Sequence, residues 1–124
     1  MGRHTVLVVD DEPAALAVIS ARIEAAGYHV KQAGSGETAL ESVKKLKPDL
    51  IILDVMMPGL NGYEVAAKLK QRKETCETPI IMVTAKAEDQ DKMSGLKSGA
   101  VYYVTKPYEP RDLLSKIRIA LEKD

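Results

Sequence analysis

Three short and nearly uninterrupted apolar segments constrain the fold of this chain most strongly. They occupy residues 6–9, 50–53 and 80–83 and consist largely of valine, isoleucine and leucine. A strand that is apolar on both faces must be covered on both faces, as in the centre of a parallel sheet that lies between two layers of helices. The three segments therefore predict an α/β protein built around a parallel sheet.

The stretches between these segments repeat apolar residues every three or four positions, which indicates amphipathic helices. The alternation predicts five βα units, with strands at Thr5–Val9, His29–Ala33, Leu50–Leu53, Ile80–Thr84 and Val101–Val104. The apolar stripes of the five helices are Leu16, Ile19 and Ile23; Ala39, Leu40, Val43 and Leu46; Val65, Ala66 and Leu69; Met93 and Leu96; and Leu113, Ile117 and Ala120. Right-handed crossovers wind such units into a doubly wound five-stranded parallel sheet, with the second and fifth strands expected at its edges.

Capping signals precede three of the predicted helices. Ser35 stands before the second helix, and Asn61 followed three residues later by Glu64 resembles a capping box before the third. Glu109 and Pro110 fit the cap and first turn of the last helix.

Length and charge limit the classes of function. The chain has 124 residues, and we expect residues 1–124 to form a single domain. Its 18 basic and 18 acidic side chains balance, so direct binding of nucleic acid is not expected. No apolar run approaches the roughly 20 residues that span a bilayer, which argues against a membrane protein. The single cysteine, Cys76, excludes an internal disulfide and agrees with a cytoplasmic location.

Polar side chains follow four of the five predicted strands. Asp10 and Asp11 come after the first strand, Asp54 after the third, Thr84 ends the fourth and Lys106 lies just past the fifth. The carboxyl ends of parallel strands meet at one edge of the sheet, where open α/β folds bind their ligands. Three crowded carboxylates repel one another unless a cation lies among them. Mg²⁺, which prefers oxygen ligands, suits this cluster, and Mn²⁺ is an acceptable substitute.

A metal ion and an ammonium group beside a carboxylate provide the parts for phosphoryl transfer. In this interpretation Asp54 is the nucleophile, Lys106 pairs with one phosphoryl oxygen and the Thr84 hydroxyl binds a second. Taken singly, each residue has a plainer interpretation as a loop residue, a strand terminus or a solvated surface charge. A carboxylate at the end of the most apolar strand, however, is rarely left without a polar partner.

Four segments of the chain together resemble the receiver domains of bacterial two-component response regulators. They are VLVVDDEP at 6–13, LDVMMPGLNGYE at 53–64, MVTA at 82–85 and VTKP at 104–107. The resemblance covers essentially the whole chain, and several motifs agree in order and spacing. It implies a flavodoxin-like (βα)5 fold with the strand order 2-1-3-4-5.

The resemblance also implies roles for individual residues. In the family, the residue that matches Asp54 forms an acyl phosphate, and the residue that matches Asp11 binds Mg²⁺ directly. The residue that matches Asp10 acts mainly through water, and the backbone carbonyl of the residue that matches Met56 completes the protein ligands.

The same resemblance implies a two-state switch that reports phosphorylation. The residues that match Thr84 and Lys106 sense the phosphoryl group, and an aromatic residue, here Tyr103, turns inward. The switch is displayed on the fourth helix, fifth strand and fifth helix, with a sensor histidine kinase or phosphotransfer protein as donor and an effector protein or domain as recipient. Val101 and Tyr102, where many relatives carry acidic residues, suggest either a partner or phosphorylation-dependent homodimer contact or an altered core packing.

Three other functions compete with this interpretation. A pseudo-receiver would keep the fold and act without phosphorylation, but the complete set of polar strand-end residues argues against it. A phosphatase with an aspartyl nucleophile would need a second acid at position 56, which is Met56. A flavin-binding protein would need a phosphate-cradling loop after the first strand, where the chain has two aspartates. Whether the chain acts alone or belongs to a longer regulator stays open from the sequence.

Overall fold

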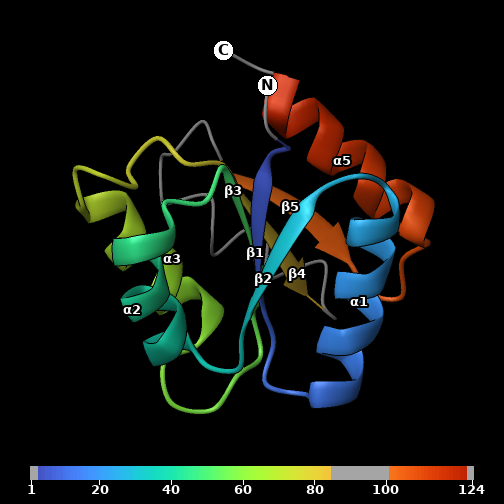
Figure 1. Ribbon diagram of the computed structural model, residues 1–124. Helices are drawn as coiled ribbons and strands as arrows, with labels where there is room; N and C mark the ends of the chain where they lie inside the picture. The colour runs from blue at the N-terminus through green and yellow to red at the C-terminus, as the bar shows by residue number, and fades with distance from the viewer. Residues whose placement is uncertain (1–2, 85–100, 123–124) are drawn as a thin grey trace.

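The computed structural model describes residues 3–84 and 101–122 and contains one five-stranded parallel sheet (Figure 1). The strand order is β2-β1-β3-β4-β5, which confirms the predicted topology and the two edge strands. The strands are β1 (Thr5–Val9), β2 (His29–Ala33), β3 (Leu50–Asp54), β4 (Ile80–Thr84) and β5 (Val101–Thr105). β3 and β5 each end one residue later than predicted, because Asp54 still pairs with Val83 and Thr105 with Thr84.

Helices cover both faces of the sheet, as Figure 1 shows. α1 (Pro13–Ala25) and α5 (Pro110–Glu122) lie on one face, and α2 (Gly36–Leu46) and α3 (Gly62–Gln71) lie on the other. The described residues thus contain four helices where the sequence predicted five, and the segment marked by Met93 and Leu96 lies outside them. No helix within these ranges combines the length and apolar character needed to cross a membrane.

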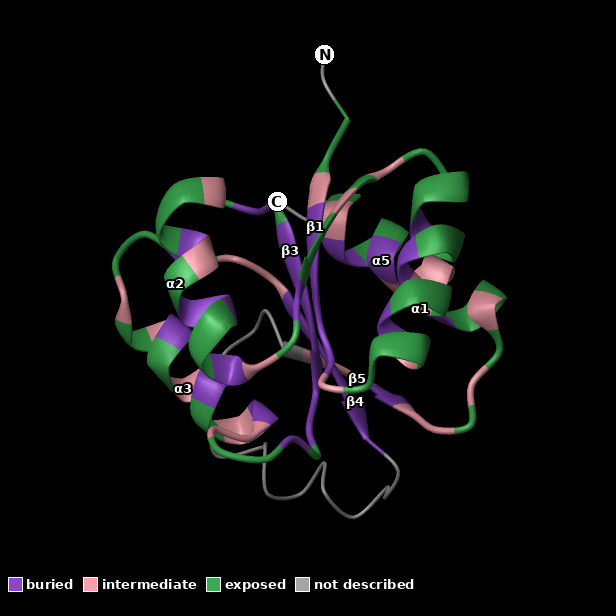
Figure 2. Cartoon of the chain, turned by 60° about the horizontal axis from the view of Figure 1, so that its bottom comes forward, coloured by how far each residue is buried: buried purple, intermediate pink, exposed green. Residues whose placement is uncertain are grey.

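Two apolar clusters, one on each face of the sheet, form the core. Leu7 belongs to the cluster under α2 and α3, whereas its neighbours Val6 and Val8 belong to the cluster under α1 and α5. This alternation follows from the two-residue period of a strand, and because both faces are covered, the central strands are apolar throughout. Figure 2 shows the result, with buried strands in the centre and the exposed sides of the helices facing outward.

The caps predicted at Ser35 and Asn61 are present and fix where α2 and α3 begin. The Ser35 side chain accepts a hydrogen bond from the backbone N–H of Thr38 at 3.1 Å. Asn61 and Glu64 form the full capping box, in which each side chain accepts a hydrogen bond from the backbone of the other residue. α5 begins at Pro110, as expected. The capping box places the start of α3 directly after the loop that leaves β3.

Tyr102 combines contact with the core and partial exposure to solvent. Its half-buried ring packs against the cluster under α1 and α5, next to the buried Val104. A half-buried side chain fits both interpretations of this residue, so the partner or homodimer contact and the altered core packing both remain predictions. The side chain of Val101 lies outside the described residues.

Candidate functional site

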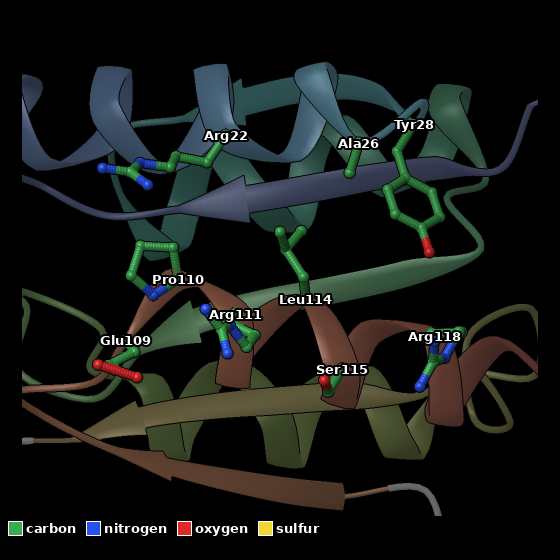
Figure 3. Close-up of a pocket in the computed structure, with 9 residues that line it drawn as sticks. All are labelled: Arg22, Ala26, Tyr28, Glu109, Pro110, Arg111, Leu114, Ser115 and Arg118. Carbon is green, nitrogen blue, oxygen red and sulfur yellow. The ribbon is translucent and has the colours of Figure 1, made fainter.

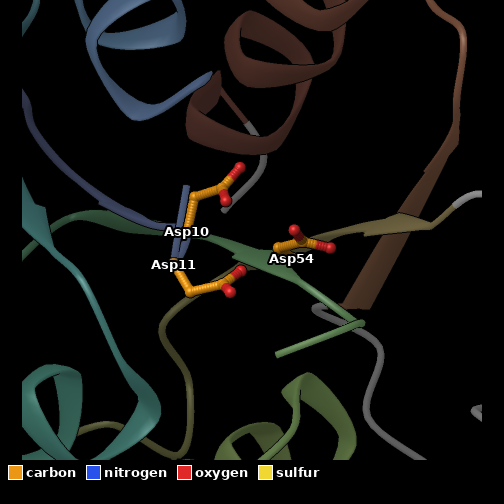
Figure 4. A group of neighbouring side chains, drawn as sticks. All are labelled: Asp10, Asp11 and Asp54. Carbon is orange, nitrogen blue, oxygen red and sulfur yellow. The ribbon is translucent and has the colours of Figure 1, made fainter. Parts of the chain in front are cut away.

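Three aspartates meet at the carboxyl edge of the sheet. Asp10 and Asp11 follow β1, and Asp54 ends the adjacent strand β3. Each offers a carboxylate oxygen, and these oxygens lie within 4.8 Å of one another (Figure 4). Asp10 and Asp54 are only 3% and 7% exposed, whereas Asp11 is half-buried. The structure thus brings together the three acidic residues that the sequence singled out.

Backbone N–H groups orient two of these carboxylates. Asp10 Oδ1 accepts a hydrogen bond from the N–H of Glu12 at 2.9 Å, and Asp54 Oδ1 accepts one from the N–H of Met56 at 3.1 Å. Each bond satisfies one oxygen of its carboxylate and leaves the second oxygen for another partner. The sequence did not predict either bond, because the N–H group that faces a carboxylate depends on the local loop conformation.

Lys106 supplies a positive charge next to the central aspartate. Its Nζ lies 3.5 Å from Asp54 Oδ2, at the opposite oxygen from the Met56 bond. The backbone N–H of Lys106 donates to the carbonyl oxygen of Thr84 at 2.7 Å, which ties the start of the β5–α5 connection to the end of β4. Thr84 is 1% exposed and ends β4, next to β3 in the sheet. Lys106 and Thr84 therefore lie at the same edge as the aspartates.

A glycine allows the loop after β3 to return closely to its strand. The N–H of Gly62 donates to the carbonyl oxygen of Val55 at 3.1 Å. A Cβ atom at Gly62 would lie 2.7 Å from the carbonyl oxygen of Asp54 and 2.8 Å from the Cα atom of Val55. Only glycine fits such an approach without a shift of the backbone. Gly62 thus holds the start of α3 against the end of β3.

Two tyrosines flank the site in different ways. Tyr103 is half-buried and packs against the core cluster under α2 and α3, next to Met82 on the adjacent strand. Its predicted role as a switch residue remains a prediction. Tyr108, which the sequence analysis did not single out, has its pKa raised by burial and by the charges of Asp10 and Asp54. The Tyr108 phenol therefore lies within the electrostatic influence of Asp10 and Asp54.

Burial dominates the electrostatics of Asp54. It raises the pKa of the Asp54 carboxyl above its ordinary value, because a buried carboxylate loses solvation by water. The Lys106 ammonium and the Met56 N–H lower that pKa, and the nearby Asp10 raises it again. One ammonium group thus faces three carboxylates, and a cation among them would offset part of the remaining negative charge.

The donor set of the cluster fits a hard divalent cation. Carboxylate oxygens from Asp10, Asp11 and Asp54 are the ligand type that Mg²⁺ and Mn²⁺ prefer, and no histidine or cysteine belongs to the group. One half-exposed member leaves a side of the cluster open to solvent, which suits an ion that retains several water ligands. The cluster could therefore hold Mg²⁺.

Comparison with known proteins decides which family has this arrangement. Residues 6–118 match the family model of the response regulator receiver domain. The chain belongs to this family. The receiver domain is 42% identical over 119 residues to the phosphate regulon transcriptional regulatory protein PhoB of Pseudomonas aeruginosa, covering 96% of this chain and 52% of PhoB. The family predicted from the sequence is therefore confirmed.

Solved structures show the same fold as this receiver domain. The chemotaxis protein CheY4 of Vibrio cholerae matches it with a TM-score of 0.89 and 32% identity, covering 97% of this chain and 100% of CheY4. The receiver domain of the sensor histidine kinase PA1611 of Pseudomonas aeruginosa matches with a TM-score of 0.87 and 27% identity, covering 98% and 100% of the two chains, and was solved with a magnesium ion in its active site cleft. The chain spans about half the length of the curated relatives that it matches.

Proposed function

We propose that this receiver domain accepts a phosphoryl group on Asp54 in a reaction that requires Mg²⁺. The observation that carries the proposal is the position of Asp54, which has the Lys106 ammonium 3.5 Å from one oxygen and the carboxylates of Asp10 and Asp11 beside it. Asp10, Asp11, Asp54 and the carbonyl of Met56 would hold the ion, and Mn²⁺ would serve in its place. The magnesium ion in the PA1611 receiver domain supports this assignment.

Asp54, Lys106 and Thr84 would each have a separate role in the phosphoryl transfer. A carboxylate oxygen of Asp54 attacks the phosphorus of a phosphohistidine, so that a P–O bond forms while the P–N bond breaks and its electron pair stays on the histidine nitrogen. The Lys106 ammonium and the Thr84 hydroxyl would each bind one phosphoryl oxygen. Held by the aspartates, Mg²⁺ would supply positive charge to the transferred group and offset the repulsion among the carboxylates. The donor would be a sensor histidine kinase or a phosphotransfer protein.

Phosphorylation would be read out at the neighbouring strand ends. Thr84 and Tyr103 are the residues we assign to the switch, because the Thr84 carbonyl is hydrogen-bonded to the N–H of Lys106 and Tyr103 packs next to Met82 on β4. A shift of Thr84 toward a phosphoryl group would change the packing below Tyr103. The receiver domain would act in the cytoplasm and present the altered surface to an effector protein or domain.

Intact-mass spectrometry tests the acceptor directly. The chain is incubated with acetyl phosphate and Mg²⁺, in parallel with Asp54→Asn, with Asp112→Asn as a matched surface control, and with a chelated sample. We expect a gain of roughly 80 Da, the mass of one phosphoryl group, in the wild type and in Asp112→Asn only. An unmodified wild type, or equal modification of Asp54→Asn, would reject Asp54 as the acceptor and favour a pseudo-receiver.

A further inference from the structure

A groove between α1 and α5 lies apart from the acidic cluster. Its volume is about 580 Å³, within the range of roughly 300–1,000 Å³ that is common for small-molecule sites. Figure 3 shows its lining, which comes from α1 and the turn after it, and from α5 and the residue before it, and which shares no residue with the proposed phosphorylation site. The lining residues are Arg22, Ala26, Tyr28, Glu109, Pro110, Arg111, Leu114, Ser115 and Arg118.

The positive charges of this groove are all arginines. Three of the five arginines of the chain line it, whereas none of the nine lysines in the described part of the chain does. Arg22, Arg111 and Arg118 form no ion pair with any residue in the described part of the chain, and Glu109 is the only carboxylate in the lining. The groove therefore carries an excess of positive charge in a chain whose overall charge is zero. An even distribution of charged side chains over the surface would not place three guanidinium groups in one groove.

The arginines are spaced along the groove. Arg111 and Arg118 are seven residues apart on α5, so they lie on one side of the helix and are separated by roughly 10 Å along its axis. Ser115 lies between them, and Arg22 faces the same groove from α1 (Figure 3). Arg111 stands in the first turn of α5, where a positive charge opposes the helix dipole. Stability of the helix therefore does not explain its position.

Two less polar side chains complete the groove. Tyr28 and Leu114 are half-buried and pack against the core cluster under α1 and α5. Figure 3 shows the Tyr28 ring and the Leu114 side chain in the space between α1 and α5. Their contacts with the core hold them in place, so they offer an apolar surface beside the exposed arginines. A ligand that matches the groove needs both an anionic part and a flat apolar part.

We propose that the groove between α1 and α5 binds a nucleotide that carries at least two phosphate groups. Guanidinium groups bind phosphate through paired hydrogen bonds, which explains arginine rather than lysine at these positions. The distance between Arg111 and Arg118 suits a chain of phosphates, and the Tyr28 ring offers a surface on which a base can stack. This binding site adds to the proposed phosphorylation and does not depend on it.

Isothermal titration calorimetry of the full chain tests the site, with chelator present so that no metal ion is held by the aspartates. The probes are ATP, pyrophosphate and adenosine. We expect saturable one-site binding of ATP, weaker binding of pyrophosphate and none of adenosine. Arg111→Gln combined with Arg118→Gln should weaken ATP binding at least about tenfold, because each loses charge-assisted hydrogen bonds. Lys68→Gln combined with Lys116→Gln, which removes the same charge outside the groove, should leave it unchanged.

Further variants distinguish a nucleotide site from a general anion site and from a protein-docking surface. Tyr28→Leu should weaken binding of ATP but not of pyrophosphate, and Asp54→Asn should change neither, so failure of the phosphorylation proposal would leave this result intact. Thermal unfolding checks that each variant is folded. Absence of saturable ATP binding, an equal effect of the lysine pair, or pyrophosphate binding as tight as ATP would overturn the nucleotide site. So would binding of a glutamate-rich helical peptide at these arginines without binding of ATP, which would make the groove a protein-docking surface.

Discussion

Lys106 Nζ lies 3.5 Å from Asp54 Oδ2 at the end of the central strand β3. The two residues are far apart in the sequence, and the parallel sheet brings them to one edge. Burial raises the pKa of the Asp54 carboxyl, and the Lys106 ammonium is the largest influence that lowers it. The ion pair therefore helps to keep the proposed nucleophile ionised in a site that otherwise favours its neutral form.

Removal of that ammonium should raise the pKa of Asp54 further. We expect Lys106→Met to shift the titration of the Asp54 carboxyl to higher pH in the metal-free protein, as followed by NMR of its carboxyl carbon. Because the folded pKa lies above the unfolded value, the stability that this group contributes is present at low pH and lost as the pH rises through the folded pKa. That loss should be larger in Lys106→Met, and urea unfolding across the acid range measures it.

Lys116→Met serves as the control for this shift, because Lys116 is a half-buried lysine on α5 without an ion pair in the described part of the chain. It should leave the Asp54 titration where it is in the wild type. If Lys106→Met and Lys116→Met gave the same titration curve, the contact at 3.5 Å would have no electrostatic effect on Asp54.

Mg²⁺ should stabilise the folded receiver domain through the three aspartates. A ligand that binds only the folded state adds about 1.4 kcal/mol to the free energy of unfolding at a tenfold excess over its Kd. We expect most of this gain to disappear in Asp10→Asn and in Asp11→Asn, because each removes a carboxylate from a cluster whose oxygens lie within 4.8 Å. Without metal, the same variants should be as stable as the wild type or more so, since they relieve repulsion.

Thermal unfolding with and without Mg²⁺ measures these differences, and Asp112→Asn, which changes a carboxylate on the exposed surface of α5, should keep the full gain. Equal stabilisation of the wild type and Asp11→Asn would place the ion elsewhere.

The strands, and the edge of the sheet at which the candidate site lies, could both be predicted from the pattern of apolar residues. Residues 50–53 are apolar on both faces, so the segment had to be a covered central strand, and the residue that follows it had to lie at the edge where the strands end. Residues far apart in sequence, such as Asp10 and Lys106, could be assigned to one site on topology alone.

Other features depended on information that the sequence does not contain. The N–H groups of Glu12 and Met56 point at carboxylates because of the local loop conformation, which residue types do not reveal. The side to which Tyr102 points was also hidden, because a strand covered on both faces has no polar side to mark its register. The sequence also did not indicate that Tyr108 lies near the aspartates. Its position depends on the path of the β5–α5 connection, and residue types do not reveal the conformation of a loop.

Gly62→Ala should disturb both the stability and the proposed acceptor. The added Cβ would lie 2.7 Å from the Asp54 carbonyl oxygen and 3.0 Å from Met82 Cε, so the backbone at the end of β3 must shift. Such overpacking costs about 1–3 kcal/mol. We expect this loss in urea unfolding together with slower phosphorylation by acetyl phosphate. Gly34→Ala, whose Cβ would meet nothing within 4 Å, is the matched control and should change neither quantity.

Ser20→Ala should stabilise the protein without affecting the acidic cluster. Ser20 is 3% exposed on the side of α1 that also buries Leu16 and Ile23, and its hydroxyl has no hydrogen-bond partner among the residues that the structure describes. Leaving a buried hydroxyl unsatisfied costs roughly 1–3 kcal/mol, and alanine is also the better helix former. We expect a gain of about 1 kcal/mol in the free energy of unfolding, with unchanged phosphorylation of Asp54.

Ser42→Ala isolates the contribution of the buried hydroxyl in that experiment. Ser42 lies in the interior of α2 and is only half-buried, so its replacement changes helix propensity but removes little desolvation. Urea unfolding of the two variants under identical conditions should therefore show the larger gain for Ser20→Ala. A gain no larger than that of Ser42→Ala, or a loss, would mean that the Ser20 hydroxyl finds a partner in solution, such as the carbonyl group one turn earlier in α1.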